Sequence, residues 1–274
     1  IKMNELNQIS RIKIKLRLAK NTDSFLEVFG SSSHKYFLDK PLEIEKIEEI
    51  EKKYKISLPN GYKTFITKIG NGGIEYPNSI IGNSGAGPYY GLFNAKRIFD
   101  SLEEYSSNYI KYLNKEPFFN EKTTEEKWYK IYNEMAEDIS DENYDDEVAK
   151  AYSGILEIGH CGCSGYLGII LNGNNKDRVI YAYDEIEYCP SFFEEINFLD
   201  WYENWLDKII SGAEIMRKDF ITKSQKEKDV VAEFITDIDD EYWQFKRLGH
   251  LRSLETLTNK SIKVLWEKYQ SIQN

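Results

Sequence analysis

The feature that most constrains the fold is the stretch from residue 154 to 206. It opens on the apolar segment ILEI at 155–158 and continues with GHCGCSGYLGIIL at 159–171, where small residues precede a second apolar run. NGNNKDRVIYAYD at 172–184 combines turn residues with a third strand-like segment, and FLDWYENWL at 198–206 carries aromatic residues at helical spacing. Short apolar runs joined by turns are typical of antiparallel hairpins. This order predicts a β-meander that is followed by a helix.

Four residues in this stretch are candidates for metal or thiol chemistry: His160, Cys161, Cys163 and Cys189. A structural zinc site normally uses cysteine pairs with two to four residues between them, whereas a single residue separates Cys161 from Cys163. Thiol catalysis requires a cysteine beside a base, but neighbours on a strand, such as His160 and Cys161, face opposite ways. We therefore expect no metal, no cofactor and no catalytic residue. The small residues are interpreted as a tight turn between buried strands.

The rest of the chain alternates between helical patterns and loops. Apolar residues in 4–20 recur near helical spacing, but apolar and basic residues also alternate over 12–18, so a helix and a strand both remain open. Pro41 is typical of a helix start, and GNGG at 70–73 is typical of a helix end. We expect helices over 42–54, 61–69, 95–113, 125–135 and 198–211, a short strand over 35–38, and helical structure beyond Gly212.

Two further segments invite an ion-binding interpretation, one as a phosphate-binding loop and the other as a calcium-binding loop. The loop GNSGAGPYYG at 82–91 has neither the Lys-Ser/Thr ending of a P-loop nor the spacing of a dinucleotide fingerprint. We interpret it as an irregular loop whose aromatic residues pack on the core. The acidic segment 137–147 lacks the Asp-x-Asp-x-Asp-Gly pattern of an EF-hand, and we expect a mobile loop there.

The charge of the chain is concentrated in its middle. The whole chain carries −10, while the first 40 residues carry eight basic and four acidic side chains and the charges from residue 214 onward balance, which leaves −14 for residues 41–213. Phosphate contacts need positive charge, so this acidity argues against nucleic acid and favours a basic partner. No apolar run is long enough to span a membrane, and no signal peptide is recognisable at the start. With three cysteines, an odd number, we expect a reducing cytoplasm.

Six segments, in this order, resemble the SUKH superfamily, which includes a yeast regulator of cell-wall synthesis and many bacterial immunity proteins of polymorphic toxin systems. They are HKYFL at 34–38 with PL at 41–42, ISLP at 56–59, GNGG at 70–73, GAGPYYGLF at 85–93, the hairpin at 154–171, and FLDWY at 198–202. The resemblance implies an α+β fold, with a mixed, largely antiparallel sheet and helices packed on one side, and no catalytic residues. It assigns the limits 1–33 to an N-terminal extension, 34–211 to the SUKH-like domain and 212–274 to a helical C-terminal extension.

The resemblance implies an immunity protein that binds and neutralises a cognate toxin domain, including nucleases, by direct contact. The alternative is a regulatory or scaffold protein with a cellular partner, as in cell-wall synthesis. Charge and loop character, rather than the family, suggest the contact residues: Glu75, Tyr76, Tyr89, Tyr90, Glu137, Asp138, Asp141, Glu142, Asp145, Asp146 and Glu147. The oligomeric state is not determined by the sequence.

Overall fold

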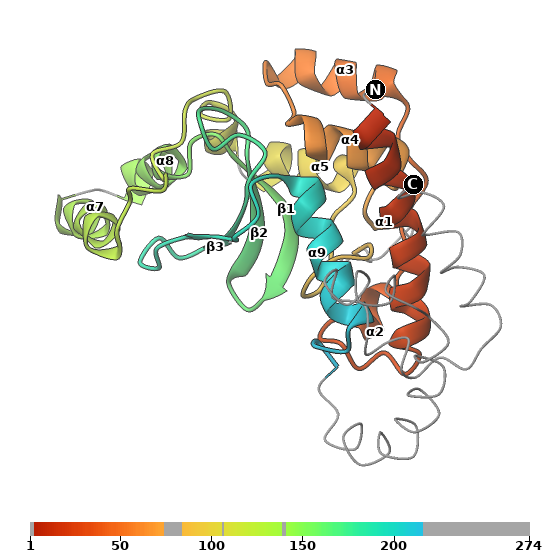
Figure 1. Ribbon diagram of the computed structural model, residues 1–274. Coiled ribbons are helices and arrows are strands. Elements are labelled where there is room, and N and C mark those ends of the chain that lie inside the picture. The colour runs from red at the N-terminus through yellow and green to blue at the C-terminus, as the bar shows by residue number, and fades with distance from the viewer. Residues whose placement is uncertain (1–2, 74–83, 106, 139–140, 216–274) are drawn as a thin grey trace, which may run out of the picture. The chain divides into compact units, whose positions relative to one another are not determined.

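Figure 1 shows the computed structural model, which describes residues 3–73, 84–105, 107–138 and 141–215. The described residues divide into two compact units. The first unit comprises the described residues up to Tyr36 and those from Tyr202 onward. The second unit is Phe37–Trp201. The domain limits expected from the sequence stay a prediction, and most of 212–274 lies outside the described residues.

The second unit combines helices with one antiparallel sheet, so the predicted α+β class is confirmed. Its helices are α3 (Ile44–Tyr54), α4 (Asn60–Lys68), α5 (Ala95–Tyr105), α6 (Ser107–Ile110), α7 (Glu125–Asp138) and α8 (Asp141–Ala151). Its strands are β1 (Ile155–Gly162), β2 (Gly165–Ile170), β3 (Val179–Tyr183) and β4 (Ser191–Phe192).

The strands follow one another in the order β1-β2-β3-β4, and every neighbouring pair is antiparallel. Gly162 pairs with Gly165, so only Cys163 and Ser164 form the turn between β1 and β2. Gly162, just before the turn, and Cys163, its first residue, both have left-handed φ values, of 97° and 49°, and glycine adopts such a conformation without steric cost. The interpretation of the small residues as a turn is confirmed.

One hydrophobic cluster of the second unit joins the sheet to the helices α7 and α8, which Figure 1 shows beside it. Trp128 of α7 is 1% exposed, and its indole Nε1 donates a hydrogen bond of 2.7 Å to the carbonyl oxygen of Ile186. The cluster around it comprises Phe119, Val148, Ala151, Tyr152, Ile155, Tyr166, Ile170, Ile180, Ala182 and Ile186. Buried side chains at alternate positions of β2 and β3 thus form the floor of this core.

A carboxylate in the β2–β3 connection holds the start of α4. Asp177 accepts hydrogen bonds from the backbone N–H groups of Gly61 at 2.8 Å and Tyr62 at 3.3 Å, two donors that a helix start leaves without a helical acceptor. A side chain at Gly61 would collide with this carboxylate, because its Cβ would lie 2.6 Å from the Oδ2 atom. Glycine is therefore the residue that allows this capping contact.

Three sequence expectations are resolved or corrected. Residues 4–20 belong to the helix α1 (Met3–Thr22), so the helical alternative was the right one. The predicted strand over 35–38 is wrong, because Lys35 and Tyr36 have left-handed φ values of 48° and 60° after the short helix α2 (Ser31–His34). The predicted mobile loop over 137–147 is also wrong, because α7 continues to Asp138 and α8 begins at Asp141.

Within the described part of the chain, no helix is long and apolar enough to cross a membrane.

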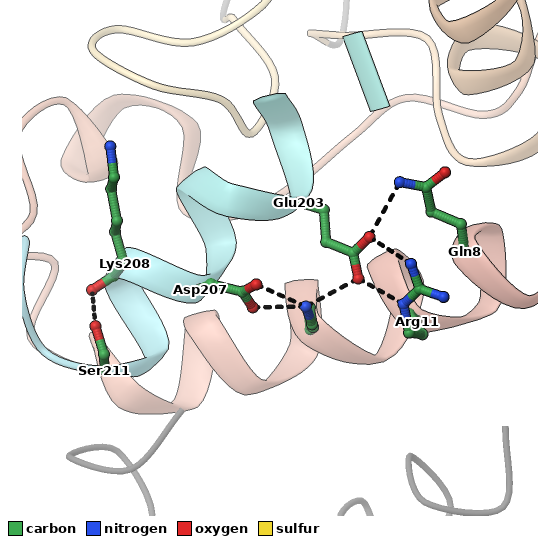
Figure 2. Close-up of polar contacts among 7 residues, drawn as sticks. Gln8, Arg11, Glu203, Asp207, Lys208 and Ser211 are labelled. Carbon is green, nitrogen blue, oxygen red and sulfur yellow. Dashed lines mark hydrogen bonds and ion pairs between the residues drawn. The ribbon is translucent and has the colours of Figure 1, made fainter. Parts of the chain in front are cut away.

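In the first unit, a cluster of ion pairs joins α1 to α9 (Phe198–Ile210), the last helix among the described residues (Figure 2). The guanidinium of Arg11 contacts both carboxylate oxygens of Glu203, at 2.7 and 2.8 Å. The Nζ atom of Lys15 lies 2.8 Å from Glu203 and 2.7 Å from Asp207, and the Lys15 side chain is only 2% exposed. The cations and the carboxylates are each four residues apart, so each pair lies on one face of its helix.

Burial and charge act differently on the two carboxyl groups of this cluster. Burial alone would raise the pKa of Glu203, but Arg11 and Lys15 together lower it. Burial raises the pKa of Asp207 to about 7, and the nearby Glu203 charge adds to the rise while Lys15 opposes it. Lys15 is the cation that directly contacts both carboxylates.

Replacing Lys15 by methionine is expected to destabilise the protein by about 3 kcal/mol, because it leaves two buried carboxylates without their shared cation. The measurement is the urea midpoint of unfolding at neutral pH. Lys13→Met is the matched control, since Lys13 is an exposed lysine of the same helix. Equal losses in the two variants would contradict the assigned role of the buried cluster.

The raised pKa of Asp207 predicts that stability falls as the pH rises. The folded state keeps a proton on Asp207 that the unfolded chain releases near its ordinary pKa of 3.8. This contribution is complete below about pH 4 and is lost as the pH passes about 7. Asp207→Asn should reduce the loss of unfolding free energy between pH 5 and pH 7.5 by about 2 kcal/mol. Glu45→Gln, at an exposed site on α3, should leave the loss unchanged; an undiminished loss in Asp207→Asn would refute the assignment.

Candidate partner-binding surface

The predicted acidic residues lie on two helices of the second unit. Glu137 and Asp138 end α7, Asp141 and Glu142 begin α8, and the remaining three acids follow within α8. The last of them, Asp146 and Glu147, have partners in the structure, whereas Asp145 is exposed.

Asp146 is part of a local hydrogen-bond network. It accepts a hydrogen bond of 2.7 Å from the hydroxyl of Tyr112 and one of 3.0 Å from Lys111, and these two donors lower its pKa. Glu147 forms an ion pair with Lys150, one turn further along α8. Two of the predicted carboxylates therefore also stabilise the helix and its surroundings.

Tyr89 and Tyr90 lie in the glycine-rich loop, which runs along the outer edge of β1. The backbone N–H of Tyr90 donates a hydrogen bond of 3.1 Å to the carbonyl of His160, and that of Phe93 donates one of 2.8 Å to Ile158. The ring of Tyr89 contacts Tyr181 of β3 with centroids 5.6 Å apart, and both predicted tyrosines are half-buried.

The other two predicted residues of this region, Glu75 and Tyr76, lie outside the described residues. The predicted contact residues that the structure describes thus occupy two places, the loop beside β1 and the helices α7 and α8.

A pocket of about 470 Å³ opens between α7 and the segment that follows β3. Its lining combines three carboxylates, three phenol rings and one thiol: Glu125, Glu126, Tyr129, Tyr183, Glu187, Tyr188 and Cys189. We call this set the tyrosine–carboxylate pocket. Tyr129 and Tyr188 are 54% and 49% exposed, so two large aromatic rings of the lining remain in contact with solvent. Within the described residues, none of the three carboxylates forms an ion pair.

The walls of the pocket are fixed by the core beneath them. The hydrogen bond from Trp128 to Ile186 joins the two walls, because Trp128 precedes Tyr129 and Ile186 precedes Glu187 in the chain. On the β3 side, the hydroxyl of Tyr152 donates a hydrogen bond of 2.9 Å to the carbonyl of Tyr183. The pocket therefore rests on groups that are already buried and bonded.

The aromatic rings of the pocket continue into a larger tyrosine surface. The ring of Tyr183 lies 5.0 Å from both Tyr181 and Tyr188, measured between centroids. The ring of Tyr129 lies 5.8 Å from that of Tyr132. Such separations are typical of interacting aromatic pairs.

Electrostatic interactions connect the pocket with the predicted acidic segment. A hydrogen bond to Glu187 and the charge of that residue raise the pKa of Tyr188. Burial raises the pKa of Tyr144 on α8, and the charges of Asp145 and Glu187 add to the rise. The pKa of Tyr144 thus depends both on Asp145, a predicted contact residue, and on Glu187, a residue of the pocket.

Sequence reasoning missed the pocket itself. The segment DEIEYC at 184–189 carries three carboxylates beside the meander, and this density was the available signal. Its pairing with the first turn of α7 depends on the long-range contact of Trp128 with Ile186, which no local pattern reveals.

The three cysteines do not form a common site. Cys161 is buried in β1, Cys163 is exposed in the turn after it, and Cys189 lies in the pocket wall. Burial raises the pKa of Cys161 to about 12 and that of Cys189 to about 11, the opposite of what an activated thiol requires. Within the described ranges, no three His, Cys, Asp or Glu side chains are grouped closely enough to hold a metal ion.

Thiol labelling should separate these cysteines. In the folded protein, 5,5′-dithiobis(2-nitrobenzoic acid) is expected to react fast with Cys163, and with Cys161 only after unfolding, because burial both shields that thiol and raises its pKa. The fast absorbance change should disappear in Cys163→Ser and persist in Cys161→Ser. A fast phase that depends on Cys161 would show that its burial is wrong.

Comparison with known proteins identifies the family of the chain. The model of the SMI1 / KNR4 family (SUKH-1) matches residues 41–204. No curated protein and no solved structure matches the chain. Proteins of the SUKH family are generally non-catalytic immunity or regulatory proteins, and the matched residues include the sheet and the tyrosine–carboxylate pocket. The chain therefore belongs to the SMI1 / KNR4 family (SUKH-1).

Proposed function

We propose that this protein is an immunity protein, which binds a cognate polymorphic toxin in the cytoplasm and blocks it by direct contact. Family membership supports a role of this general kind. The observation that carries the proposal is the tyrosine–carboxylate pocket, because it combines exposed aromatic rings with carboxylates that have no ion-pair partner among the described residues.

Exposed aromatic side chains are well suited to protein contacts. Tyrosine supplies a large, rigid area at a low entropy cost, and it is enriched among the residues that dominate binding energy. Tyr129 and Tyr188 have this character, since each exposes about half of its surface.

The negative charge selects the type of partner. An acidic surface attracts a basic protein and increases the rate of encounter. Nuclease toxins must contact phosphates and therefore carry positive charge. We accordingly propose a basic toxin domain, such as a nuclease, as the partner. The predicted contact residues Tyr89, Tyr90 and Asp145 belong to the same proposal.

Neutralisation of this kind requires no chemistry by the inhibitor. The raised pKa values of Cys161 and Cys189 accord with a protein that acts by binding. A regulatory role is the alternative within the same family. It predicts that a cellular protein, rather than a toxin, binds the candidate surface.

Co-expression with the toxin domain encoded beside this protein is the direct test. Wild-type protein is expected to restore growth, and a catalytically inactive form of the toxin should co-purify with it at equal stoichiometry. Higher ionic strength should slow the association, because steering between opposite charges is screened by salt.

A matched co-expression strain that carries the toxin and an empty vector sets the level of killing. Continued killing in the presence of soluble wild-type protein would contradict the proposal. Equimolar complexes with an enzyme of cell-wall synthesis, and none with the toxin, would favour the regulatory alternative.

A further inference from the structure

We propose that the tyrosine–carboxylate pocket receives an arginine side chain of the partner protein. This inference rests on the proposed function for the identity of the partner, but the chemistry of the pocket is argued from its own residues. Such a pocket would make one side chain of the toxin the anchor of the complex.

The aromatic part of the lining suits a flat cation. Tyr129 approaches the pocket from α7, while Tyr183 and Tyr188 approach it from β3 and the segment after it. The electron-rich faces of such rings attract cations, more often a guanidinium than an ammonium. The guanidinium also stacks on aromatic faces, because it is planar and weakly hydrated.

The charged part of the lining supplies acceptors for the same group. Glu125, Glu126 and Glu187 are exposed carboxylates, and the lining contains no basic residue that would neutralise them. A guanidinium has five N–H donors in a fixed fork that matches carboxylate oxygens. The pocket therefore provides both the acceptors and the stacking surfaces that arginine uses.

The pocket is formed in advance of binding. The hydrogen bond of Trp128 to Ile186 is buried and joins its two walls, so a ligand can enter without a rearrangement of the backbone that carries the lining. Its volume of about 470 Å³ accommodates a complete arginine side chain with part of the adjoining backbone. The three carboxylates repel anions. A purely apolar side chain would remove water from these carboxylates without replacing its hydrogen bonds, which is unfavourable.

The first experiment tests the chemistry of the pocket without any toxin. The probe is the capped dipeptide acetyl-Arg-Arg-amide, titrated into the full-length isotope-labelled protein and followed by NMR. The arginine dipeptide is expected to change the NMR chemical shifts of Tyr129, Tyr183 and Tyr188. The capped citrulline dipeptide has nearly the same shape without the charge, and it should bind at least about tenfold more weakly.

Variants then assign the binding to the lining. The triple variant Glu125→Gln, Glu126→Gln and Glu187→Gln should weaken the arginine dipeptide at least about tenfold. The triple variant Glu45→Gln, Glu48→Gln and Glu104→Gln changes the net charge equally at exposed sites on α3 and α5, and it should bind as wild type does. Tyr129→Phe should retain binding and Tyr129→Ala should weaken it, because the ring rather than the hydroxyl is the contact.

The second experiment uses the cognate toxin domain and separates this inference from the proposed function. Loss of affinity for the toxin in the pocket triple variant, but not in the control triple variant, supports the inference. Neutralisation by wild type and by the pocket variant with equal affinity would overturn the inference and leave the proposed function standing. Binding of the arginine dipeptide without any neutralisation of toxin would support the pocket chemistry and contradict the proposed function. Failure of the dipeptide to shift the pocket residues would overturn the inference.

Discussion

The buried indole of Trp128 is the contact on which the candidate surface depends. Its ring is buried in the cluster that joins α7 and α8 to the sheet, and its N–H group donates a hydrogen bond to the carbonyl of Ile186, 58 residues further along the chain. Without this bond, a buried carbonyl would lose its partner and the two walls of the pocket would lose their direct connection. A core residue thereby determines where Tyr129 and Glu187 are placed, although neither of them belongs to the core.

Local patterns predict the meander and several helices of the second unit, because these elements are short and strongly patterned, but they miss α8. The meander, its tight turn at Cys163 and the helices that follow Pro41 and precede GNGG all follow from residue type and spacing. The segment 4–20 could not be assigned in this way. Its alternating basic residues resemble a strand, whereas Lys15 is buried against Glu203 and Asp207 of a helix near residue 200. Only a long-range ion cluster explains that lysine.

The contact residues expected from the sequence stay a prediction, and none of them lines the tyrosine–carboxylate pocket. Acidity and tyrosine content both follow from the sequence, and Asp145 lies on the helix beside the pocket. The density of acids at 137–147 predicts a mobile loop, because runs of like charge are typical of solvated segments. In the structure they end one helix and begin another, where Lys111 and Lys150 offset part of their charge. The carboxylates of the pocket come instead from two distant segments, because Glu125 and Glu126 lie 62 and 61 residues before Glu187, and sequence periodicity cannot bring such segments together.

The glycine-rich loop along β1 has a consequence for how recognition can change over time. Its backbone bonds to Ile158 and His160 occupy the outer edge of β1, while the other edge of the sheet is closed by the two-residue strand β4. An occupied edge and a very short one leave little template for a foreign strand, so partners that bind by strand addition are disfavoured. Recognition then depends on exposed side chains rather than on backbone pairing at a sheet edge. If the proposed function holds, point substitutions among these exposed side chains redirect the protein to a new partner while its hydrogen-bonded scaffold is inherited intact.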